Sequence, residues 1–368
     1  MITLLVFLPL LVFYTVFVVY AERKVAGFIQ DRLGPMEVGH YGLAQTIADL
    51  VKLIQKEDIT PKSADHWPFK IAPLVIFISI FLGFSILPIN INWVGAGAQS
   101  GIFFLITIIS LDVLGVLMAG WSSNSKFSLF GAIRSVAQII SYEVPMGLVV
   151  LSVAILCQSL DLQSISIQQG IALSANGGSL SDTNYLFGIK ALGINVSEIG
   201  GFLTWNIFRS PILLIAYLIF FVCSLAESNR VPFDLPEAES ELIGGFHTEY
   251  SGFRWSIIML AEYAMVLLLS FLGVILFLGS WHTPLPNIGS VELARWTSGT
   301  AGDWSSILWG SFWLIGKTFL IVFVNIWVRF TYPRLRVDQL MNLSWKYLTP
   351  AALIIVLITS LWRILMIN

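Results

Sequence analysis

Acidic residues crowd one short stretch of this chain. The sequence from Glu227 to Arg254 reads ESNRVPFDLPEAESELIGGFHTEYSGFR and lies between two apolar runs. It holds six of the 22 acidic residues of a protein that is only 11% charged. Like charges at this spacing repel each other unless they share protons or cations. The stretch therefore predicts a carboxylate cluster at a membrane boundary, where it would handle protons or a polar headgroup.

A short helix is expected inside this stretch. The sequence Asp234-Leu-Pro-Glu237 has the form of a capping box, with proline in the first turn. From that start, Glu237 and Glu241 share one face of the helix and Glu239 points elsewhere. A glycine pair follows and ends the helix. An ordinary solvated acidic loop is the alternative interpretation of this composition.

Carboxylates also occur inside the apolar runs on both sides of this stretch. Glu227 ends one run, and Glu262 lies about two turns into the next, with no basic residue in the same run. These two residues favour proton handling over a solvated loop. A carboxylate buried in lipid costs free energy unless it is paired, hydrated or protonated, so each one is a site candidate. We expect Glu262 to be an obligatory proton relay.

Three more ionisable residues lie within other apolar runs. Glu143 precedes Pro145 by two positions, so the helix there can kink or open locally. Asp112 and Lys317 lie near the middles of their runs, and both are site candidates for the same energetic reason. The sequence leaves open whether Asp112 and Lys317 form a pair with each other.

The composition indicates a helical membrane protein. Hydrophobic residues make up 57% of the chain, including 26 Phe and 13 Trp, and a soluble domain could not cover so much apolar surface. Apolar stretches recur at about 20 residues, the length that crosses a bilayer as a helix. We therefore predict an all-α polytopic membrane protein with about eight transmembrane helices. They are expected at about 2–20, 71–88, 101–120, 133–157, 210–226, 255–278, 309–328 and 348–365.

The distribution of basic residues predicts the orientation of the chain. Segments 21–70, 121–134, 227–254 and 329–346 hold 15 of the 20 Lys and Arg residues. Because basic loops stay on the cytoplasmic side, these segments are expected inside and both termini outside. The segment 227–254 is then an acidic inner loop of a single integral membrane domain that comprises the whole chain, 1–368.

The first inner loop, 21–70, contains a predicted amphipathic helix, GLAQTIADLVKLIQKE. This helix is too short to span the bilayer, so it is expected at the interface. Its apolar stripe is Leu43, Ile47, Leu50, Val51 and Ile54, and opposite it lie Gln45, Asp49, Lys52 and Glu57. Two interpretations stay open: the helix anchors the chain at the membrane surface, or its polar face lines a site.

On the opposite side, segment 158–208 is long, rich in Ser, Gly and Asn, and almost free of basic residues. Its apolar patches are too broken for a membrane span. We predict a long outer loop with one short helix and assign no function to it.

The sequence offers little for binding a cofactor. Cys157 and Cys223 lie far apart without a CxxC motif, which argues against a zinc or iron–sulfur site. All four histidines fall in polar segments, where they could not hold a haem between spans. The glycine-rich GAGAQSG has no βαβ context and is interpreted as a loop. We expect no metal and no redox centre in this chain, so a partner would supply electrons.

Four segments together resemble one family closely, the membrane H subunit (mitochondrial subunit 1) of proton-pumping NADH–quinone oxidoreductase, complex I. The first contains AERKVAGFIQDRLGP with GLAQTIADLVKLIQKE, and the second is GWSSNSKFSLFGAIRSVAQIISYEVP. The third is AESNRVPFDLPEAESELIGGFHTEYSG with MLAEYAM, and the fourth is YPRLRVDQLMNLSWK. They occur in family order and cover nearly all the inner segments. Two features depart from the family pattern: the length of 158–208, and Asp112, where a small residue is expected.

The resemblance implies a subunit that joins a peripheral redox arm to a membrane arm. It would form much of the quinone chamber and the start of a carboxylate-lined proton path. By matching motif positions, the resemblance places in the quinone-binding region Arg23, Arg32, Asp49 and Arg230. It places in the proton relay Glu143, Glu227, Asp234, Glu237, Glu239, Glu241 and Glu262.

The same resemblance implies the partners. Quinone would be the substrate, and NADH, FMN and iron–sulfur clusters would reside on other subunits of the peripheral arm. The chain would contact membrane-arm and peripheral-arm subunits and lipid, but no nucleic acid. Its location would be the bacterial inner (plasma) membrane, or the mitochondrial inner membrane if it is organellar.

Other functions predict different features. A related membrane-bound hydrogenase or another quinone-linked complex would use a similar subunit, so the electron donor stays open. A secondary transporter would favour paired broken helices with ionisable groups at the midplane, whereas here the acids cluster at the inner boundary. A purely structural anchor would tolerate Gln at its intramembrane Glu positions.

Overall fold

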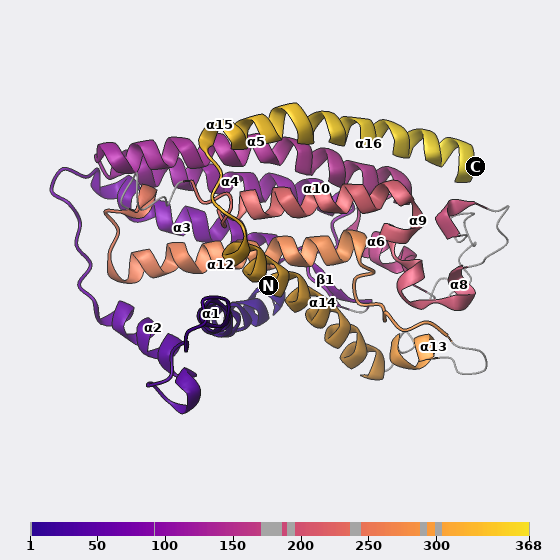
Figure 1. The fold of residues 1–368 in the computed structure, drawn as a ribbon, viewed down its shortest axis with the longest axis horizontal. Coiled ribbons are helices and arrows are strands. Elements are labelled where there is room, and N and C mark those ends of the chain that lie inside the picture. Colours follow the sequence, from indigo (N-terminus) through magenta and orange to yellow (C-terminus); the bar gives the residue numbers. More distant parts are fainter. Residues whose placement is uncertain are drawn as a thin grey trace.

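The computed structural model describes residues 2–91, 93–170, 186–189, 196–235, 244–287, 293–298 and 304–367. Long helices dominate this part of the chain, and most of them lie side by side along the longest axis of the molecule (Figure 1). The strands β1 (Pro88–Asn90) and β2 (Trp93–Val94) form a short antiparallel pair. This is the all-α architecture that the composition predicts, since helices satisfy every backbone hydrogen bond within lipid.

Seven helical segments in the described part of the chain are long and apolar enough to cross a membrane, and an eighth apolar helix is 17 residues long. They match the eight predicted spans in order. They are α1 (Ile2–Ile29), α3 (His66–Gly83), α4 (Gly101–Ser122), α5 (Lys126–Cys157), α10 (Pro211–Glu227), α12 (Gly252–Phe277), α14 (Trp304–Thr331), and the continuous helix of α15 (Val337–Asn342), a π-helical turn (Leu343–Leu348) and α16 (Thr349–Trp362), which ends in a second π-helical turn (Arg363–Ile367).

The helix α12 lies at the centre of the bundle. In its most apolar 18-residue window 83% of the residues are buried, against 28% for α1 and α14 and 17% for the C-terminal helix. Glycine allows close approach in the layer beside it, because a Cβ on Gly115 of α4 would lie 2.6 Å from the Ile76 side chain of α3. Such close contacts drive helix association in lipid, where the hydrophobic effect between helices is absent.

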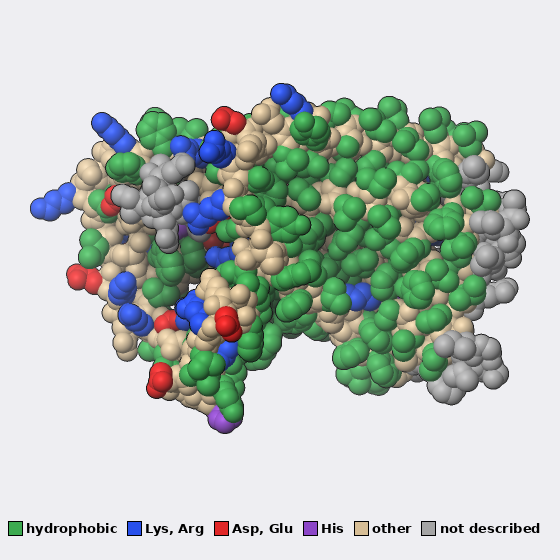
Figure 2. All heavy atoms as spheres, in the orientation of Figure 1, with side chains coloured by type: hydrophobic (Ala, Val, Ile, Leu, Met, Phe, Trp, Pro, Cys, Tyr) green, Lys and Arg blue, Asp and Glu red, His purple; other side chains and the backbone are tan. Residues whose placement is uncertain are grey.

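Charged side chains gather at one end of the molecule, around α2 (Gln45–Gln55) and the first inner loop (Figure 2). An ion pair of 2.7 Å between Arg254 and Asp58 ties this loop to the start of α12. A 3₁₀ turn, His40–Gly42, precedes α2, and another, Gly245–His247, precedes α12. The expected amphipathic helix is therefore present, and its apolar side chains Leu43, Ile47, Val51 and Ile54 are exposed in this chain.

The opposite end carries short helices. Segment 158–208 was expected to contain one short helix, but its described part contains several. They are α6 (Leu162–Gln168), a 3₁₀ turn (Leu186–Gly188), α8 (Val196–Ile199), a second 3₁₀ turn (Gly201–Thr204) and α9 (Asn206–Arg209), with α13 (Leu293–Ser298) nearby (Figure 1).

Side-chain hydrogen bonds, which hydropathy does not detect, stabilise these short elements. Asp161 caps α6 by accepting from the backbone N–H groups of Gln163 and Ser164. The buried Gln169 accepts from the backbone N–H groups of Asn206 and Gly279, at 3.2 and 2.9 Å. The helix predicted from Asp234 to Glu241 falls mostly on 236–243, outside the described residues.

Candidate functional site

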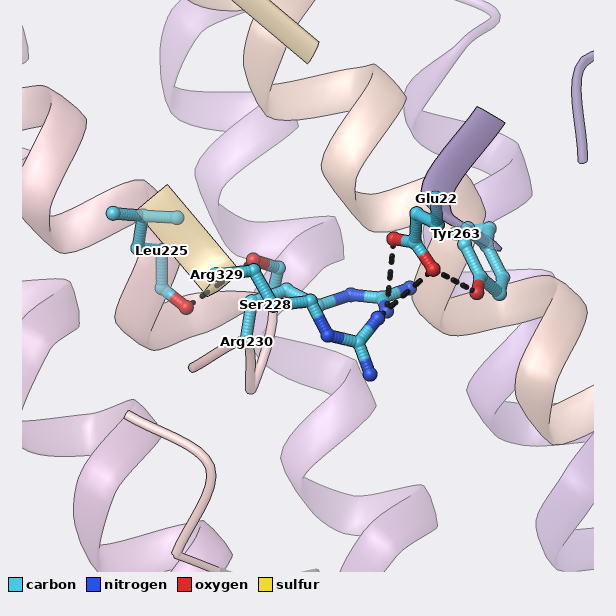
Figure 3. Close-up of polar contacts among 6 residues, drawn as sticks. All are labelled: Glu22, Leu225, Ser228, Arg230, Tyr263 and Arg329. Atoms are coloured by element: carbon cyan, nitrogen blue, oxygen red, sulfur yellow. Dashed lines mark hydrogen bonds and ion pairs between the residues drawn. The ribbon is translucent and has the colours of Figure 1, made fainter. Parts of the chain in front are cut away.

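A buried carboxylate on α1 gathers side chains from three other segments. Glu22 Oε2 accepts hydrogen bonds from the Tyr263 hydroxyl of α12 at 2.8 Å and from Arg329 Nη1 of α14 at 2.9 Å. Its Oε1 lies 3.5 Å from Arg230 Nη1. Figure 3 shows both guanidinium groups converging on the Glu22 carboxylate. We call Glu22, Arg230, Tyr263 and Arg329 the charge network.

Arg230 reaches this network from the turn that follows α10. Its backbone N–H donates to the Leu225 carbonyl at 3.1 Å, and its guanidinium stacks over the Tyr263 ring at 4.1 Å (Figure 3). Burial alone would lower the pKa of Arg230, but Tyr263, Glu22 and Glu262 together raise it above its ordinary value. Arg230 therefore stays charged and links the charge network electrostatically to Glu262.

A cavity of about 850 Å³ adjoins the charge network. Its wall includes Glu22, Tyr263 and Arg329, together with Arg23, Ala26 and the segment 32–37, which returns beside α1. We call it the large cavity. A tight turn makes this return possible, since a Cβ on Gly27 would lie 2.9 Å from the Arg32 carbonyl oxygen. The Lys24 ammonium then holds the segment by donating to the Pro35 carbonyl at 2.8 Å.

The predicted quinone-binding residues fall into two groups around this cavity. Arg23 and Arg32 line it directly. Asp49 of α2 does not line it but pairs with Arg23 Nη1 at 2.6 Å, so the polar face of α2 positions a side chain of the wall. Arg230 lies behind Glu22, next to the cavity and not in its wall. The structure thus brings all four predicted residues to one region.

A second, much smaller cavity lies deeper in the bundle. Its volume is about 10 Å³, and its lining includes Asp112 of α4, Glu227 of α10 and Glu262 of α12. We call it the small cavity. Asp112 and Glu227 are buried, with 6% and 1% of their surfaces exposed. Both Glu227 carboxylate oxygens and Asp112 Oδ1 lack a hydrogen-bond partner within the described part of the chain. Three segments distant in sequence therefore meet at one polar point inside the membrane.

Glu143 of α5 extends this group of carboxylates. It is half-buried, lies within electrostatic reach of Glu227, and forms a side-chain hydrogen bond with Ser110 of α4. The predicted intramembrane carboxylates Glu143, Glu227 and Glu262 thus lie close together. Within the described ranges, no set of three or more His, Cys, Asp and Glu residues is arranged to hold a metal ion.

The other predicted relay residues behave differently. Asp234 is buried, and its Oδ2 pairs with Arg334 Nη2 at 3.1 Å, so it joins the acidic loop to the segment before α15. It does not line the small cavity. Glu237, Glu239 and Glu241 lie outside the described residues, and their relay role stays a prediction.

Sequence reasoning missed three members of the charge network as site residues. Glu22 and Arg329 looked like ordinary boundary charges, and Tyr263 was only the neighbour of Glu262. A usable signal was present in Glu22, because the apolar run of α1 continues past it into a helix that ends at Ile29. A carboxylate on the same helix as its apolar run is more buried than one in a loop.

The structure also answers the question about Lys317. Its ammonium donates to the carbonyls of Leu278 and Ser280, both at 2.8 Å, and lies 4.4 Å from the centre of the Trp205 ring. Lys317 therefore satisfies carbonyls at the C-terminal end of α12, as cations commonly do at helix ends. It makes no pair with Asp112.

Taken together, the fold and the site define an integral membrane protein in which a charge network separates a large cavity from buried carboxylates. The comparisons agree with this class. The family model for NADH dehydrogenase matches residues 1–360, and the chain belongs to that family. The resemblance noted in the four inner segments is thereby confirmed.

Similar proteins carry one name, that of the NADH-quinone oxidoreductase H subunit. The second such protein of Cytophaga hutchinsonii is 58% identical over 366 residues and is covered, like this chain, over 100% of its length. The H subunit of NADH-quinone oxidoreductase from Chlorobaculum parvum is 47% identical over 346 residues, which cover 94% of this chain and 87% of the relative. The protein of that name from Geobacillus sp. is 41% identical over 358 residues, covering 96% and 92%.

Proposed function

We propose that this chain is the quinone-chamber and proton-coupling membrane subunit of an NADH–quinone oxidoreductase. Family membership and the shared name of its relatives support the assignment to this enzyme complex. Quinone is then the substrate at this subunit. NADH, FMN and the iron–sulfur clusters belong to partner subunits, and this chain binds none of them.

The large cavity fits the headgroup end of a quinone chamber. An isoprenoid quinone needs an apolar entrance that closes on a few polar groups. The cavity of about 850 Å³ lies within the usual size range of ligand pockets. Arg23, Arg32 and Tyr263 offer hydrogen-bond donors at its wall, while Ala26 and Phe330 offer apolar surface. Arg23 is oriented by Asp49, so the donors are held in place before the substrate arrives.

Coupling begins at Glu22, which lines the large cavity and also belongs to the charge network. Quinone reduction takes up two protons and two electrons, so the charge beside Glu22 changes during each turnover. That change alters the interaction of Glu22 with Arg230, and Arg230 in turn interacts with Glu262. Glu262 passes the change to the small cavity as a change of protonation.

One observation carries this proposal: the Glu22 carboxylate contacts the large cavity on one side and binds Arg230 on the other. Electrostatic coupling decays with distance and solvent screening, so it is strongest through buried groups in direct contact. Glu22, Tyr263 and Arg230 are each only 9% exposed. The path from substrate to intramembrane carboxylates therefore runs through groups that water screens little.

The same proposal places the chain in its surroundings. It is an integral membrane protein, and we assign it to a bacterial inner membrane, or to the mitochondrial inner membrane if it is organellar. The charged end that carries α2 faces the peripheral arm of the complex. The apolar stripe of α2 lies at the membrane interface, and the exposed apolar faces of α14 and α16 contact lipid or other membrane subunits.

Photoaffinity labelling of the assembled complex tests the quinone chamber. A quinone analogue with a photoreactive headgroup should cross-link to residues 19–37 and to the Tyr263 or Arg329 peptides, and excess natural quinone should prevent the labelling. Labelling elsewhere in this subunit, or in other subunits only, would show that the large cavity is not the headgroup site.

A further inference from the structure

Asp112 lies in an unexpected place for an acid. It belongs to α4, whose mean hydropathy of 2.5 is the highest among the candidate spans in the described part of the chain. The close contact between Gly115 and Ile76 of α3 leaves this part of α4 little room to shift. A carboxylate in such a position is costly to retain, because an isolated buried charge loses its hydration. The chain keeps one there, and neither the quinone chamber nor Lys317 accounts for it.

The small cavity gives Asp112 its surroundings. Asp112 and Glu227 face it from α4 and α10, and Glu262 faces it from α12. Its lining includes no Lys, Arg or His, and its other polar members are Ser228 and Asn229. The nearest charged groups beyond it are Glu143, which is within reach of Glu227, and Arg230, which is within reach of Glu262. No cation in the described part of the chain lines the cavity to balance Asp112 and Glu227.

Two buried carboxylates that face one space cannot both be ionised without a large cost, so neighbouring acids of this kind hold protons between them. The free hydrogen-bonding capacity fits this, since Asp112 Oδ1 and both oxygens of Glu227 lack partners among the described residues. A volume of about 10 Å³ corresponds to about one water molecule when it is measured with a water-sized probe. Such a water would have the polar partners that internal waters require.

We infer that Asp112 and Glu227, bridged by one internal water in the small cavity, form a proton-holding pair between Glu262 and Glu143. A proton arriving from Glu262 is taken up by the pair through the water, and a proton leaves Glu227 toward Glu143. The water is unchanged at the end, and no other reactant is consumed. Asp112 is therefore a fourth intramembrane carboxylate of the relay, and this role presupposes the quinone-linked function proposed above.

Infrared difference spectroscopy of the assembled complex tests the proton-holding pair directly. Protonated carboxyl groups have a C=O stretching band that shifts in deuterated water, and we expect one such band to change when the quinone is reduced. Asp112→Asn should remove or shift this band. The control Asp161→Asn, at the cap of α6, should leave it unchanged, because asparagine also caps helices well. An unaltered band in Asp112→Asn would overturn the inference.

Activity measurements in reconstituted vesicles give a second test. Asp112→Gln and Asp112→Glu match each other in size, so their comparison isolates the titrating proton even if the smaller Asp112→Asn assembles poorly. Per assembled complex, we expect Asp112→Gln to lower quinone-dependent proton pumping about tenfold or more, as loss of a proton-transfer group does. We expect Asp112→Glu to restore most of it. Equal pumping by the two variants would contradict the proposed role.

The double variant separates this inference from the proposed function. Asp112→Asn combined with Glu227→Gln should lose little more than the more impaired single variant, since the two residues act as one unit. If Glu262→Gln abolishes pumping while Asp112→Asn and Asp112→Gln do not affect it, the relay exists without Asp112. If none of these variants affects pumping, the proposed coupling function itself is wrong.

Discussion

The Tyr263 hydroxyl of α12 donates a 2.8 Å hydrogen bond to the Glu22 carboxylate of α1, across 241 residues of sequence. Both residues are only 9% exposed. The same Tyr263 ring lies under the Arg230 guanidinium at 4.1 Å. One side chain therefore orients the carboxylate and also supports its cation, which makes Tyr263 a positioning residue of the charge network.

Tyr263→Phe removes the hydroxyl but keeps the ring beneath Arg230. Because hydrogen bonds to charged groups contribute about 1.5–3 kcal/mol, we expect a loss of stability of that order. Thermal inactivation of the solubilised complex measures it. Tyr217→Phe on α10 is the control, since Tyr217 makes no side-chain hydrogen bond to the described residues and should show little change. An unchanged inactivation temperature for Tyr263→Phe would mean that the hydrogen bond is not important in the assembled protein.

Glu262→Gln tests the proton relay. Glutamine keeps the shape and hydrogen bonding of glutamate but cannot titrate, so the complex should assemble. Quinone reduction and proton pumping should both fall about tenfold or more, the range expected when a proton-transfer group is lost. Electron transfer from the donor to a water-soluble artificial acceptor at the peripheral arm should persist.

The matched control for this experiment is Glu57→Gln. Glu57 is exposed in the first inner loop, and its variant should retain both activities. Full quinone reduction with normal pumping in Glu262→Gln would show that Glu262 is a structural polar contact. The same result would favour the structural-anchor interpretation of the chain.

Ala26→Phe tests the chamber by filling it. Ala26 is buried on α1 and lines the large cavity, so the added ring occupies space that the quinone headgroup would need. We expect the KM for quinone to rise several-fold, or kcat to fall if binding is blocked, with NADH oxidation by artificial acceptors unchanged. Phe28→Trp is the control: Phe28 lies on the same helix but is 80% exposed. Equal quinone kinetics in the two variants would argue against the chamber.

His282 predicts a pH dependence of stability. Burial, with Lys317 nearby, lowers the pKa of His282 to about 4. An unfolded histidine has a pKa of about 6.5, so between these two pKa values the unfolded chain binds a proton that the folded chain does not. Stability should therefore fall as the pH drops through this window, by about 3 kcal/mol, and level off below it.

The variant His282→Gln should remove this contribution, because glutamine does not titrate. Thermal inactivation of the solubilised complex from neutral pH down to about pH 4.5 provides the measurement. The difference between wild type and variant should change with pH in that window. A constant difference would mean that His282 is protonated in the folded protein or keeps an ordinary pKa.

The orientation of the chain follows from its basic residues and can be labelled. Ser63 and Ser305 are both exposed, one in the first inner loop and one at the start of α14. Cys157 and Cys223 are buried, so they leave a low background. In sealed vesicles, Ser63→Cys and Ser305→Cys should react with an impermeant thiol reagent from opposite faces. Reaction of both from one face would refute the eight-span orientation.

The sequence by itself determined the fold class and the order of the spans. Apolar runs of bilayer length can only be helices in lipid, so hydropathy was enough to place α1 to α16 within a few residues. It also identified Glu143, Glu227 and Glu262 as candidates, because a carboxylate inside an apolar run is costly wherever its helix packs. Motif order then identified the family, which the comparisons confirm.

Only the tertiary structure decided which charges meet. Glu22 and Arg329 are 307 residues apart, and no local pattern pairs them. Asp112 could have paired with Lys317 by depth alone, yet the packing of α4 on α3 directs it to the small cavity, and Lys317 binds the carbonyls that end α12. Hydropathy reports how deep a residue lies but not the direction in which its helix turns it. The charge network and the carboxylate pair depend on that direction, and long-range packing alone sets it.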